Sequence, residues 1–164
     1  MNKDKNLFPK GFLWGASTAS HQVEGNTHNQ WTVWELENAA RLAKTAKQRL
    51  DWMPKWDSVK DQARDPNNYI SGAGVDHYKR YKEDFRLAKS LNHNAFRFGV
   101  EWSRVEPEMG VWDAEAWQHY REYVQELLDL GIEPIMNLWH WTLPTWFTDI
   151  GGFKKKSNIK YFDR

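Results

Sequence analysis

The sequence predicts an α/β fold in which short strands and amphipathic helices alternate along the chain. Three stretches, 12–18, 95–101 and 133–139, have the length and composition of strands. Two helical segments, 76–91 and 114–130, lie before the second and the third of them. This order favours a parallel sheet with right-handed crossovers, as in the first three β-α units of a truncated (β/α)8 TIM barrel.

The length supports only part of such a barrel. Eight units take roughly 250 residues, whereas the chain has 164. We therefore interpret 1–164 as the N-terminal part of a barrel. An open doubly wound sheet has the same local pattern and is the alternative, although neither GxGxxG nor a P-loop follows the first strand.

The composition excludes several classes of protein. Hydrophobic content of 40% and charged content of 27% are typical of a globular chain, and a net charge of +1 argues against nucleic-acid binding. There is no cysteine for disulfides or thiol chemistry, and the six histidines lack metal-ligand spacing, so we expect neither metal nor cofactor. No stretch is long enough for a membrane span and no signal peptide is recognisable, which favours a cytoplasmic location.

The first predicted strand follows a turn at Pro9–Gly11 and ends among polar side chains, including Gln22. The amide of Gln22 offers one donor and one acceptor, which suits two neighbouring sugar hydroxyls. An ordinary strand end followed by a helix cap would give the same pattern. The 11 tryptophans similarly suit either a large core or stacking on sugar rings.

Residues 31–74 are too long for a plain connection, and we interpret them as a functional insertion at the barrel rim. A short amphipathic helix is expected at 35–50, followed by a less regular part between two prolines. The insertion carries four tryptophans that either line a pocket mouth or pack the insertion on itself: Trp31, Trp34, Trp52 and Trp56.

The two long helices are predicted from apolar stripes, and Gly131 gives a C-cap signal for the second helix. The stripes are Tyr78, Tyr81, Phe85 and Ala88 in the first, and Trp117, Tyr120, Val124, Leu127 and Leu128 in the second. A short helical turn is expected near 144–149, and the start of another helix at 158–164.

The second strand has two unlike faces. Its aromatic face is expected to meet the helices, and its other face, with Arg97 and Glu101, to look into the barrel. Glu101 is too far along the strand to pair with Arg97. Arg97 therefore predicts an acidic partner from another strand, either in a site or in a structural ion pair.

His140 and Trp141 follow the third strand, at the edge where barrel enzymes build their sites. An imidazole beside an indole provides one polar contact and one apolar platform, which a pyranose ring would use. A purely structural histidine is the alternative reading.

The N-terminal stretch resembles the signature of family 1 glycoside hydrolases, which include β-glucosidases, β-galactosidases and 6-phospho-β-glycosidases. The matching residues are Phe12, Trp14, Gly15, Ser17, Ala19, Ser20, His21, Gln22 and Glu24. Asn26 departs from the signature, where a small residue is usual. Further stretches resemble the family over 76–104 with Pro107, and over 131–144, where Trp139 replaces a frequent Tyr and Thr142 a frequent Asp.

The resemblance implies a retaining hydrolase acting on terminal, non-reducing β-D-glycosides. By that resemblance Gln22 and His140 bind hydroxyls of a β-linked glucoside, galactoside or small oligosaccharide, with Trp141 beside them. Arg97 would support the nucleophilic carboxylate.

The family's two catalytic glutamates have no counterpart in the sequence. One belongs to an Asn-Glu-Pro motif that the 164 residues do not contain. Glu106 and Glu108 are the nearest carboxylates to a strand end, and we expect them to be solvated loop charges. The chain alone is therefore expected to be inactive, with a non-catalytic sugar-binding module as the alternative, and to self-associate through open barrel edges.

Overall fold

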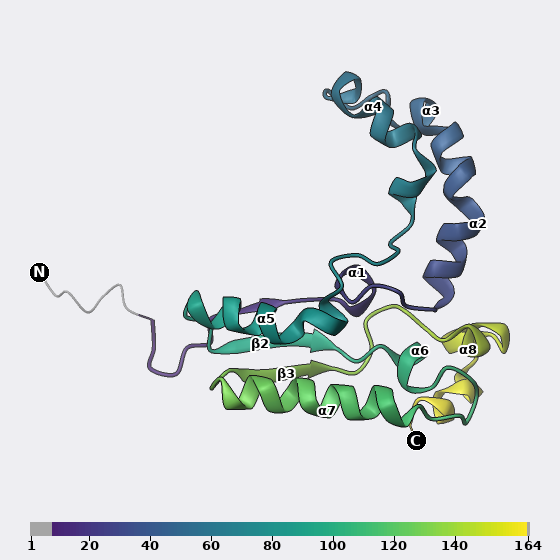
Figure 1. Cartoon of the computed structure of the whole chain (residues 1–164). Helices are drawn as coiled ribbons and strands as arrows, with labels where there is room; N and C mark the ends of the chain where they lie inside the picture. The colour runs from purple at the N-terminus through teal and green to yellow at the C-terminus, as the bar shows by residue number, and fades with distance from the viewer. Residues whose placement is uncertain (1–7, 164) are drawn as a thin grey trace, which may run out of the picture.

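The computed structural model describes residues 8–163. Its sheet has three parallel strands in chain order, β1 (Gly15–Ser17), β2 (Ala95–Gly99) and β3 (Glu133–Asn137). The register places Ser17 beside Arg97 and Arg97 beside Ile135. The predicted order and direction of the strands are therefore confirmed (Figure 1).

Helices α5 (His77–Ser90) and α7 (Ala114–Asp129) pack on the aromatic face of β2, as predicted. Phe96 and Phe98 of β2 are buried between them. The other members of this core are Tyr81, Phe85, Ala88, Tyr123, Leu127 and Ile132. The opposite face of the sheet has no such cover among the described residues, and Ile135 is 42% exposed there.

The stripe predicted for α7 is wrong at two positions. Trp117 and Leu128 are 40% and 51% exposed. The buried side of α7 runs instead through Ala116, Tyr120, Tyr123 and Leu127. Their three- and four-residue spacing turns Trp117 toward Trp112, where the two rings pack beside each other at 6.1 Å.

The end of α7 is a Schellman motif, which confirms the C-cap signal at Gly131. The Ile132 amide donates to the carbonyl of Leu127, and the Gly131 amide donates to that of Leu128. Gly131 has φ +63°, a left-handed conformation that costs glycine little. The motif turns the chain directly into β3.

A second core lies beyond the carboxyl ends of the strands. It joins α6 (Trp102–Val105), α8 (Thr145–Asp149), η3 (Gly152–Lys154) and the side of α7 through Trp102, Tyr120 and Phe147. The helix expected at 158–164 is the 3-10 helix η4 (Lys156–Tyr161), which begins earlier and has tighter turns.

The segment between β1 and α5 is largely helical and extends away from the sheet (Figure 1). It contains α2 (Gln30–Lys44), α3 (Ala46–Leu50), α4 (Trp56–Arg64) and η2 (Pro66–Tyr69). The single helix expected at 35–50 is interrupted at Thr45, whose hydroxyl donates to the carbonyl of Arg41. The part expected to be less regular contains α4, whose short apolar stripe of Trp56, Val59 and Ala63 is half-buried and was overlooked between the two prolines.

The first strand is shorter than predicted because the chain turns into a one-turn helix, α1 (Ser20–Val23). Gly15 allows β1 to approach β2 closely, since a Cβ there would lie 2.3 Å from the Ala95 carbonyl oxygen.

Among residues 8–163, no helix combines the length and the apolarity that crossing a bilayer requires.

Candidate functional site

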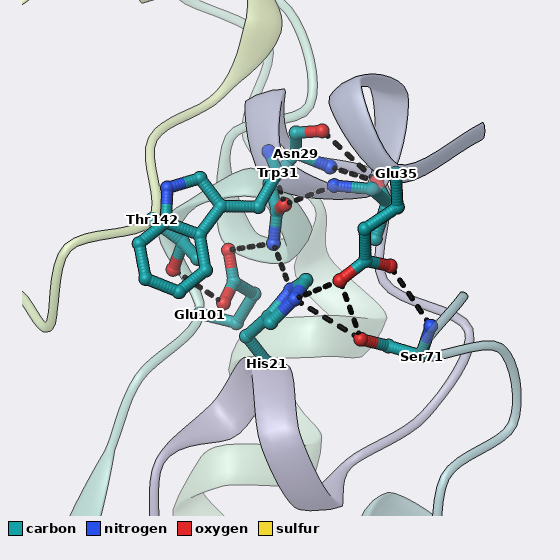
Figure 2. Close-up of polar contacts among 8 residues, drawn as sticks. His21, Asn29, Trp31, Glu35, Ser71, Glu101 and Thr142 are labelled. Atoms are coloured by element: carbon teal, nitrogen blue, oxygen red, sulfur yellow. Dashed lines mark hydrogen bonds and ion pairs between the residues drawn. The ribbon is translucent and has the colours of Figure 1, made fainter. Parts of the chain in front are cut away.

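A network of buried side chains connects the segments that follow all three strands (Figure 2). His21 follows β1, Glu101 follows β2 and Thr142 follows β3. Asn29, at the start of α2, lies between the first two of these groups. The carboxyl ends of the strands are thus held together by hydrogen bonds at the edge where barrel enzymes place their sites.

Asn29 is fully buried and uses both ends of its amide. Its Oδ1 accepts from the backbone amides of Trp31 and Thr32, which caps α2. Its Nδ2 can then only donate, and it lies 3.3 Å from His21 Nδ1 and 3.4 Å from Glu101 Oε1. His21 Nδ1 is therefore the acceptor, and the ring proton lies on Nε2.

Glu101 is 1% exposed, and both of its oxygens accept hydrogen bonds. Ser103 Oγ donates to Oε1 at 2.8 Å, and Thr142 Oγ1 donates to Oε2 at 2.9 Å. The Glu101 backbone amide donates to the hydroxyl of Tyr120. A carboxylate held in this way orients the loops after β2 and β3 relative to each other.

Glu35 on α2 completes the network on the side of His21. Its Oε1 accepts from His21 Nε2 at 2.9 Å and from Ser71 Oγ at 2.7 Å, and its Oε2 accepts from the Ser71 amide. Burial acts to raise the pKa of Glu35, but the Ser71 and His21 hydrogen bonds outweigh it and hold the pKa below its ordinary value. Glu35 is therefore anionic at neutral pH.

A second buried carboxylate, Glu24, lies behind the strand ends. Arg104 Nε donates to Oε2 at 2.9 Å, and the Tyr120 hydroxyl lies within 3.0 Å of both oxygens. Burial raises the pKa of Glu24 to about 7, against the opposing effects of Arg104 and Tyr120. Arg104 also lies 4.1 Å from the ring centre of Tyr78 and bonds the Gly25 carbonyl, so this cluster anchors the loop after β1.

The loop after β3 presents Trp141 in a strained backbone conformation. Trp141 has φ +72°, and the Thr142 amide donates across it to the His140 carbonyl at 2.9 Å, which defines a γ-turn of the rare positive-φ type. Gln30 holds this turn from α2: its Nε2 donates to the Trp141 carbonyl, and its Oε1 accepts from the Leu143 amide. The turn leaves the Trp141 side chain 65% exposed.

The structure places the four residues predicted to form the site on three different segments. Gln22 is exposed on α1, next to His21, rather than at the end of an extended strand. His140 is half-buried, and its Nδ1 has no hydrogen-bond partner among the described residues. Arg97 is half-buried on the uncovered face of the sheet.

The described residues contain no carboxylate partner for Arg97. Its Nη1 donates instead to Ser17 Oγ at 3.0 Å. An acidic partner for Arg97, like the joint sugar-binding role of Gln22, His140 and Trp141, stays a prediction.

The expectation for Glu106 is wrong, whereas Glu108 is exposed as predicted. Glu106 is fully buried: its Oε2 accepts from the Trp102 indole, and its Oε1 accepts from the Gly110 amide. The carboxylate thus links α6 to the turn that follows it. The spacing of the charges in the sequence does not reveal this link. It is therefore a structural group.

Sequence reasoning missed Asn29, which joins α2 to Glu101. The available signal was local, because an Asn followed three residues later by Thr32 is compatible with a capping box, which the structure contains. The contact with Glu101 spans 72 positions and leaves no local pattern.

Over the described range 8–163, no group of three or more His, Cys, Asp or Glu side chains is arranged to hold a metal ion.

Comparison with known proteins places this chain in a family. The model of glycosyl hydrolase family 1 matches residues 4–164, so the chain belongs to that family. β-Glucosidase A of Acetivibrio thermocellus is 30% identical over 96% of this chain and 32% of its own length. β-Glucosidase A of Thermotoga maritima is 31% identical over 94% of this chain and 31% of its own length.

Solved structures agree with the sequence relatives. A β-glycosidase from Pyrococcus horikoshii superposes with a TM-score of 0.74 and 35% identity, over 94% of this chain and 30% of that structure. A family 1 β-glucosidase from Thermotoga maritima superposes with a TM-score of 0.70 and 27% identity. The chain thus spans about a third of the length of the relatives that it matches.

Proposed function

We propose that the chain forms the N-terminal part of the sugar-binding site of a retaining β-glycosidase. The substrates would be terminal, non-reducing β-D-glucosides or β-D-galactosides, including small oligosaccharides. The observation that supports this proposal is the buried network of His21, Asn29, Glu101 and Thr142, which holds the ends of all three strands together. Such a scaffold suits a site that must keep several polar groups fixed around one ring.

In this proposal each predicted site residue has a separate role. Gln22 contacts neighbouring sugar hydroxyls with both ends of its amide, and His140 contacts another through a ring nitrogen. The exposed indole of Trp141 covers an apolar face of the sugar. Arg97 supplies positive charge on the inner face of the sheet, where it would support a nucleophilic carboxylate.

The catalytic carboxylates of the proposed reaction would come from outside the 164 residues. Retention requires two carboxyl groups about 5–5.5 Å apart, one as acid/base and one as nucleophile. Glu24 and Glu101 do not suit either task, because every oxygen of both already accepts a hydrogen bond from the protein. They act as structural anchors for the groups that bind the sugar.

The identity of the sugar is proposed from the relatives. One solved structure of the Thermotoga maritima β-glucosidase contains a substituted glucoimidazole, and it superposes with a TM-score of 0.70. We therefore place a glucose-like ring first among the candidate ligands of this chain. A cytoplasmic location also stays a prediction, which fractionation of the source cells would test.

A chimera tests the function. The 164 residues would replace the matching third of the Pyrococcus horikoshii β-glycosidase, whose remaining two thirds would complete the barrel. We expect hydrolysis of an aryl β-glucoside by the chimera and none by the 164-residue chain alone. Gln22→Ala in the chimera should lower kcat/KM by roughly 10- to 100-fold, about 1.4–2.7 kcal/mol of transition-state stabilisation.

Gln48→Ala, at an exposed position on α3, is the matched control and should leave kcat/KM unchanged. Turnover by the 164 residues alone would show that a catalytic pair exists within them and would overturn the proposal. Sugar binding by a folded but inactive chimera would favour a non-catalytic sugar-binding module.

A further inference from the structure

The far end of the helical segment between β1 and α5 concentrates positive charge. Residues 41–56 contain five cations and one carboxylate, a net charge of +4, whereas the whole chain has +1 and its other residues therefore have −3. The stretch covers the last turn of α2, all of α3 and the turn that leads into α4. We call it the basic tip, and its cations are Arg41, Lys44, Lys47, Arg49 and Lys55.

Most of the charge of the basic tip is uncompensated. Within residues 8–163, Lys47 is the only one of the five cations that pairs with a carboxylate, that of Asp51 at 3.1 Å. All five side chains are exposed. Helix dipoles favour cations at the carboxyl ends of α2 and α3, but Lys55 is the N-cap of α4, where a cation is unfavourable. Helix stability therefore does not account for the whole cluster.

An exposed indole lies among these cations. Trp52 is 75% exposed, the largest exposed fraction among the large hydrophobic side chains of the described residues. Packing of the insertion on itself, one of the two roles expected for its tryptophans, thus does not explain Trp52. Its Nε1 donates to the Arg49 carbonyl at 2.8 Å, so the ring can leave water without losing that hydrogen bond.

The basic tip presents these groups on a packed scaffold. Ala43 and Ala46 beneath it are 6% and 0% exposed. The Arg49 guanidinium donates to the Leu42 carbonyl at 2.8 Å and to the Tyr69 hydroxyl at 3.2 Å. Helices α3 and α4 lie at the end of the segment that is farthest from the sheet (Figure 1). A flat surface can therefore approach the tip without meeting the sheet.

We propose that the basic tip docks on the anionic surface of a lipid membrane, with the Trp52 indole in the interface and the cations against the headgroups. Indoles concentrate at the boundary between water and lipid, and clusters of Lys and Arg are attracted to anionic headgroups. The negative charge of the remaining residues is repelled by the same surface, which orients the chain with its tip toward the lipid. The inference is independent of the proposed function.

The combination of groups favours a membrane over other polyanions. A nucleic-acid duplex offers phosphates for the cations but no apolar layer for Trp52, and an acidic protein would have to supply a matching pocket for the indole. A bilayer presents anionic headgroups and an apolar layer within one surface. It also needs no shape complementary to a protruding tip.

The test is flotation of the 164-residue chain with lipid vesicles in a density gradient, which separates bound chain from self-associated chain. Vesicles of equal parts phosphatidylserine and phosphatidylcholine are compared with vesicles of phosphatidylcholine alone. We expect partitioning into the anionic vesicles to be at least about 10-fold stronger and to weaken as salt is added. Lys44→Glu combined with Lys55→Glu should abolish the preference.

Lys82→Glu combined with Lys89→Glu is the matched control, because both lysines are exposed on α5 and the change in net charge is the same. This pair should keep the preference for anionic vesicles. Circular dichroism of each variant would establish that the helices are retained, and the salt dependence of the parent chain tests the electrostatic attraction without any substitution.

The indole is tested separately. Trp52→Ala should weaken partitioning into the anionic vesicles by about 3- to 10-fold. Bromine-labelled phosphatidylcholine in these vesicles should quench the indole fluorescence of the parent chain, and quench that of Trp52→Phe markedly less.

Three results would overturn the proposal. The first is equal binding to the two kinds of vesicle, or binding to neither at low salt. The second is an equal loss of binding in the α5 control, which would assign the attraction to overall charge. The third is binding to soluble polyglutamate or to a single-stranded polynucleotide as tightly as to the vesicles, unaffected by Trp52→Ala, which would make the tip a site for an acidic protein or a nucleic acid.

Discussion

Trp141 is the residue at which local backbone preference and the proposed function conflict most clearly. A non-glycine residue at positive φ costs about 1–2 kcal/mol, and bulky residues are rarely found there. Burial does not offset this cost, because the indole is 65% exposed. The offset comes from the hydrogen bonds that Gln30 makes to the turn. Strain of this kind is typical of sites where a side chain must point in one direction.

We expect Trp141→Gly to raise the free energy of unfolding by about 1 kcal/mol while abolishing sugar binding, because glycine adopts positive φ without strain. Urea denaturation would measure the free energy of unfolding, and titration with methyl β-D-glucoside would measure sugar binding. Trp141→Ala is the control, since it removes the indole but keeps the strain. Equal stability of the Gly and Ala variants would contradict the assignment of strain to this position.

Glu24 should make stability depend on pH. Its pKa in the folded chain is about 7, above the value of about 4.5 for an unpaired glutamate, so the folded state binds the proton more tightly. The stability that this group contributes is full below pH 4.5 and is lost as pH rises toward 7. Glu24→Gln should flatten that part of a urea-midpoint profile measured between pH 4.5 and 8.

Glu35 has the opposite effect on stability, because its pKa is lowered in the folded chain. Its contribution to the free energy of unfolding is present above the pKa that it has in the unfolded chain and disappears as pH falls. Glu35→Gln is therefore the matched comparison and should change the acidic end of the same profile. An unaltered slope between pH 4.5 and 7 in Glu24→Gln would refute the assignment to Glu24.

The candidate site was only partly predictable at the residue scale. Gln22, His140 and Trp141 could be named because local patterns and the family resemblance both mark them. Asn29, Glu35 and Ser71 could not, since they support the site through contacts between distant positions, 72 apart for Asn29 and Glu101 and 36 apart for Glu35 and Ser71. The prediction for Glu106 was wrong because a charged residue next to a proline in a turn gives no indication that an indole and a backbone amide will bury it.

At the scale of elements, α2 connects two parts of the molecule. Its first turn is capped by Asn29 and holds the Trp141 turn through Gln30, while its distal end belongs to the helical segment that extends from the sheet. Displacement of α2 would therefore be transmitted to the loop after β3.

Two substitutions of Asn29 should separate its capping role from its role in the network. Asn29→Asp keeps the oxygen that caps α2 but faces Glu101 with a second carboxylate, so we expect a loss of about 2–4 kcal/mol at pH 7 that shrinks on acidification, as the two carboxylates take up a shared proton. Asn29→Ser keeps a cap without the charge and should be less destabilising near neutral pH. Thermal unfolding at pH 4 and 7 would measure the stability of both variants. If the stability of the two variants depended on pH in the same way, the result would argue against the Glu101 contact.

Elements with an apolar stripe or a strong cap could be predicted from the sequence, and the others could not. Helices α5 and α7 and strand β2 have periodic apolar residues because they enclose one core. Helix α4 buries no residue fully, and its apolar positions are only Trp56, Val59 and Ala63 in a largely polar stretch, so its stripe was overlooked. The division into α2 and α3 depends on one threonine hydroxyl, which periodicity does not detect.

The whole molecule exposes more surface than its size requires. The accessible surface is 11258 Å² for 19.5 kDa, whereas a compact monomer of that mass has about 8500 Å². Within residues 8–163, the outer strands β1 and β3 each pair with β2 alone, and Ile135 and Leu138 remain exposed on β3 and just beyond it. Such edges tend to pair with further strands.

We therefore expect the 164-residue chain to self-associate in sedimentation velocity at micromolar concentration. Ile135→Lys, which places a charge on the uncovered face of β3, should shift the distribution toward monomer. Leu87→Lys is the control, because Leu87 is 62% exposed on α5, and it should leave the distribution unchanged. A parent chain that sediments as a monomer with a cooperative melt would contradict self-association through the sheet.

The network around Glu101 also has a consequence for the order in which the chain acquires its structure. The Glu101 contacts with Asn29 and Thr142 join residues 72 and 41 positions apart, so neither can form until long loops have closed. During synthesis from the N-terminus, Asn29 and Glu101 emerge from the ribosome well before Thr142. The α5–β2 pair can assemble first, but the edge of the sheet proposed to bind the sugar stays incomplete until the loop after β3 has been translated.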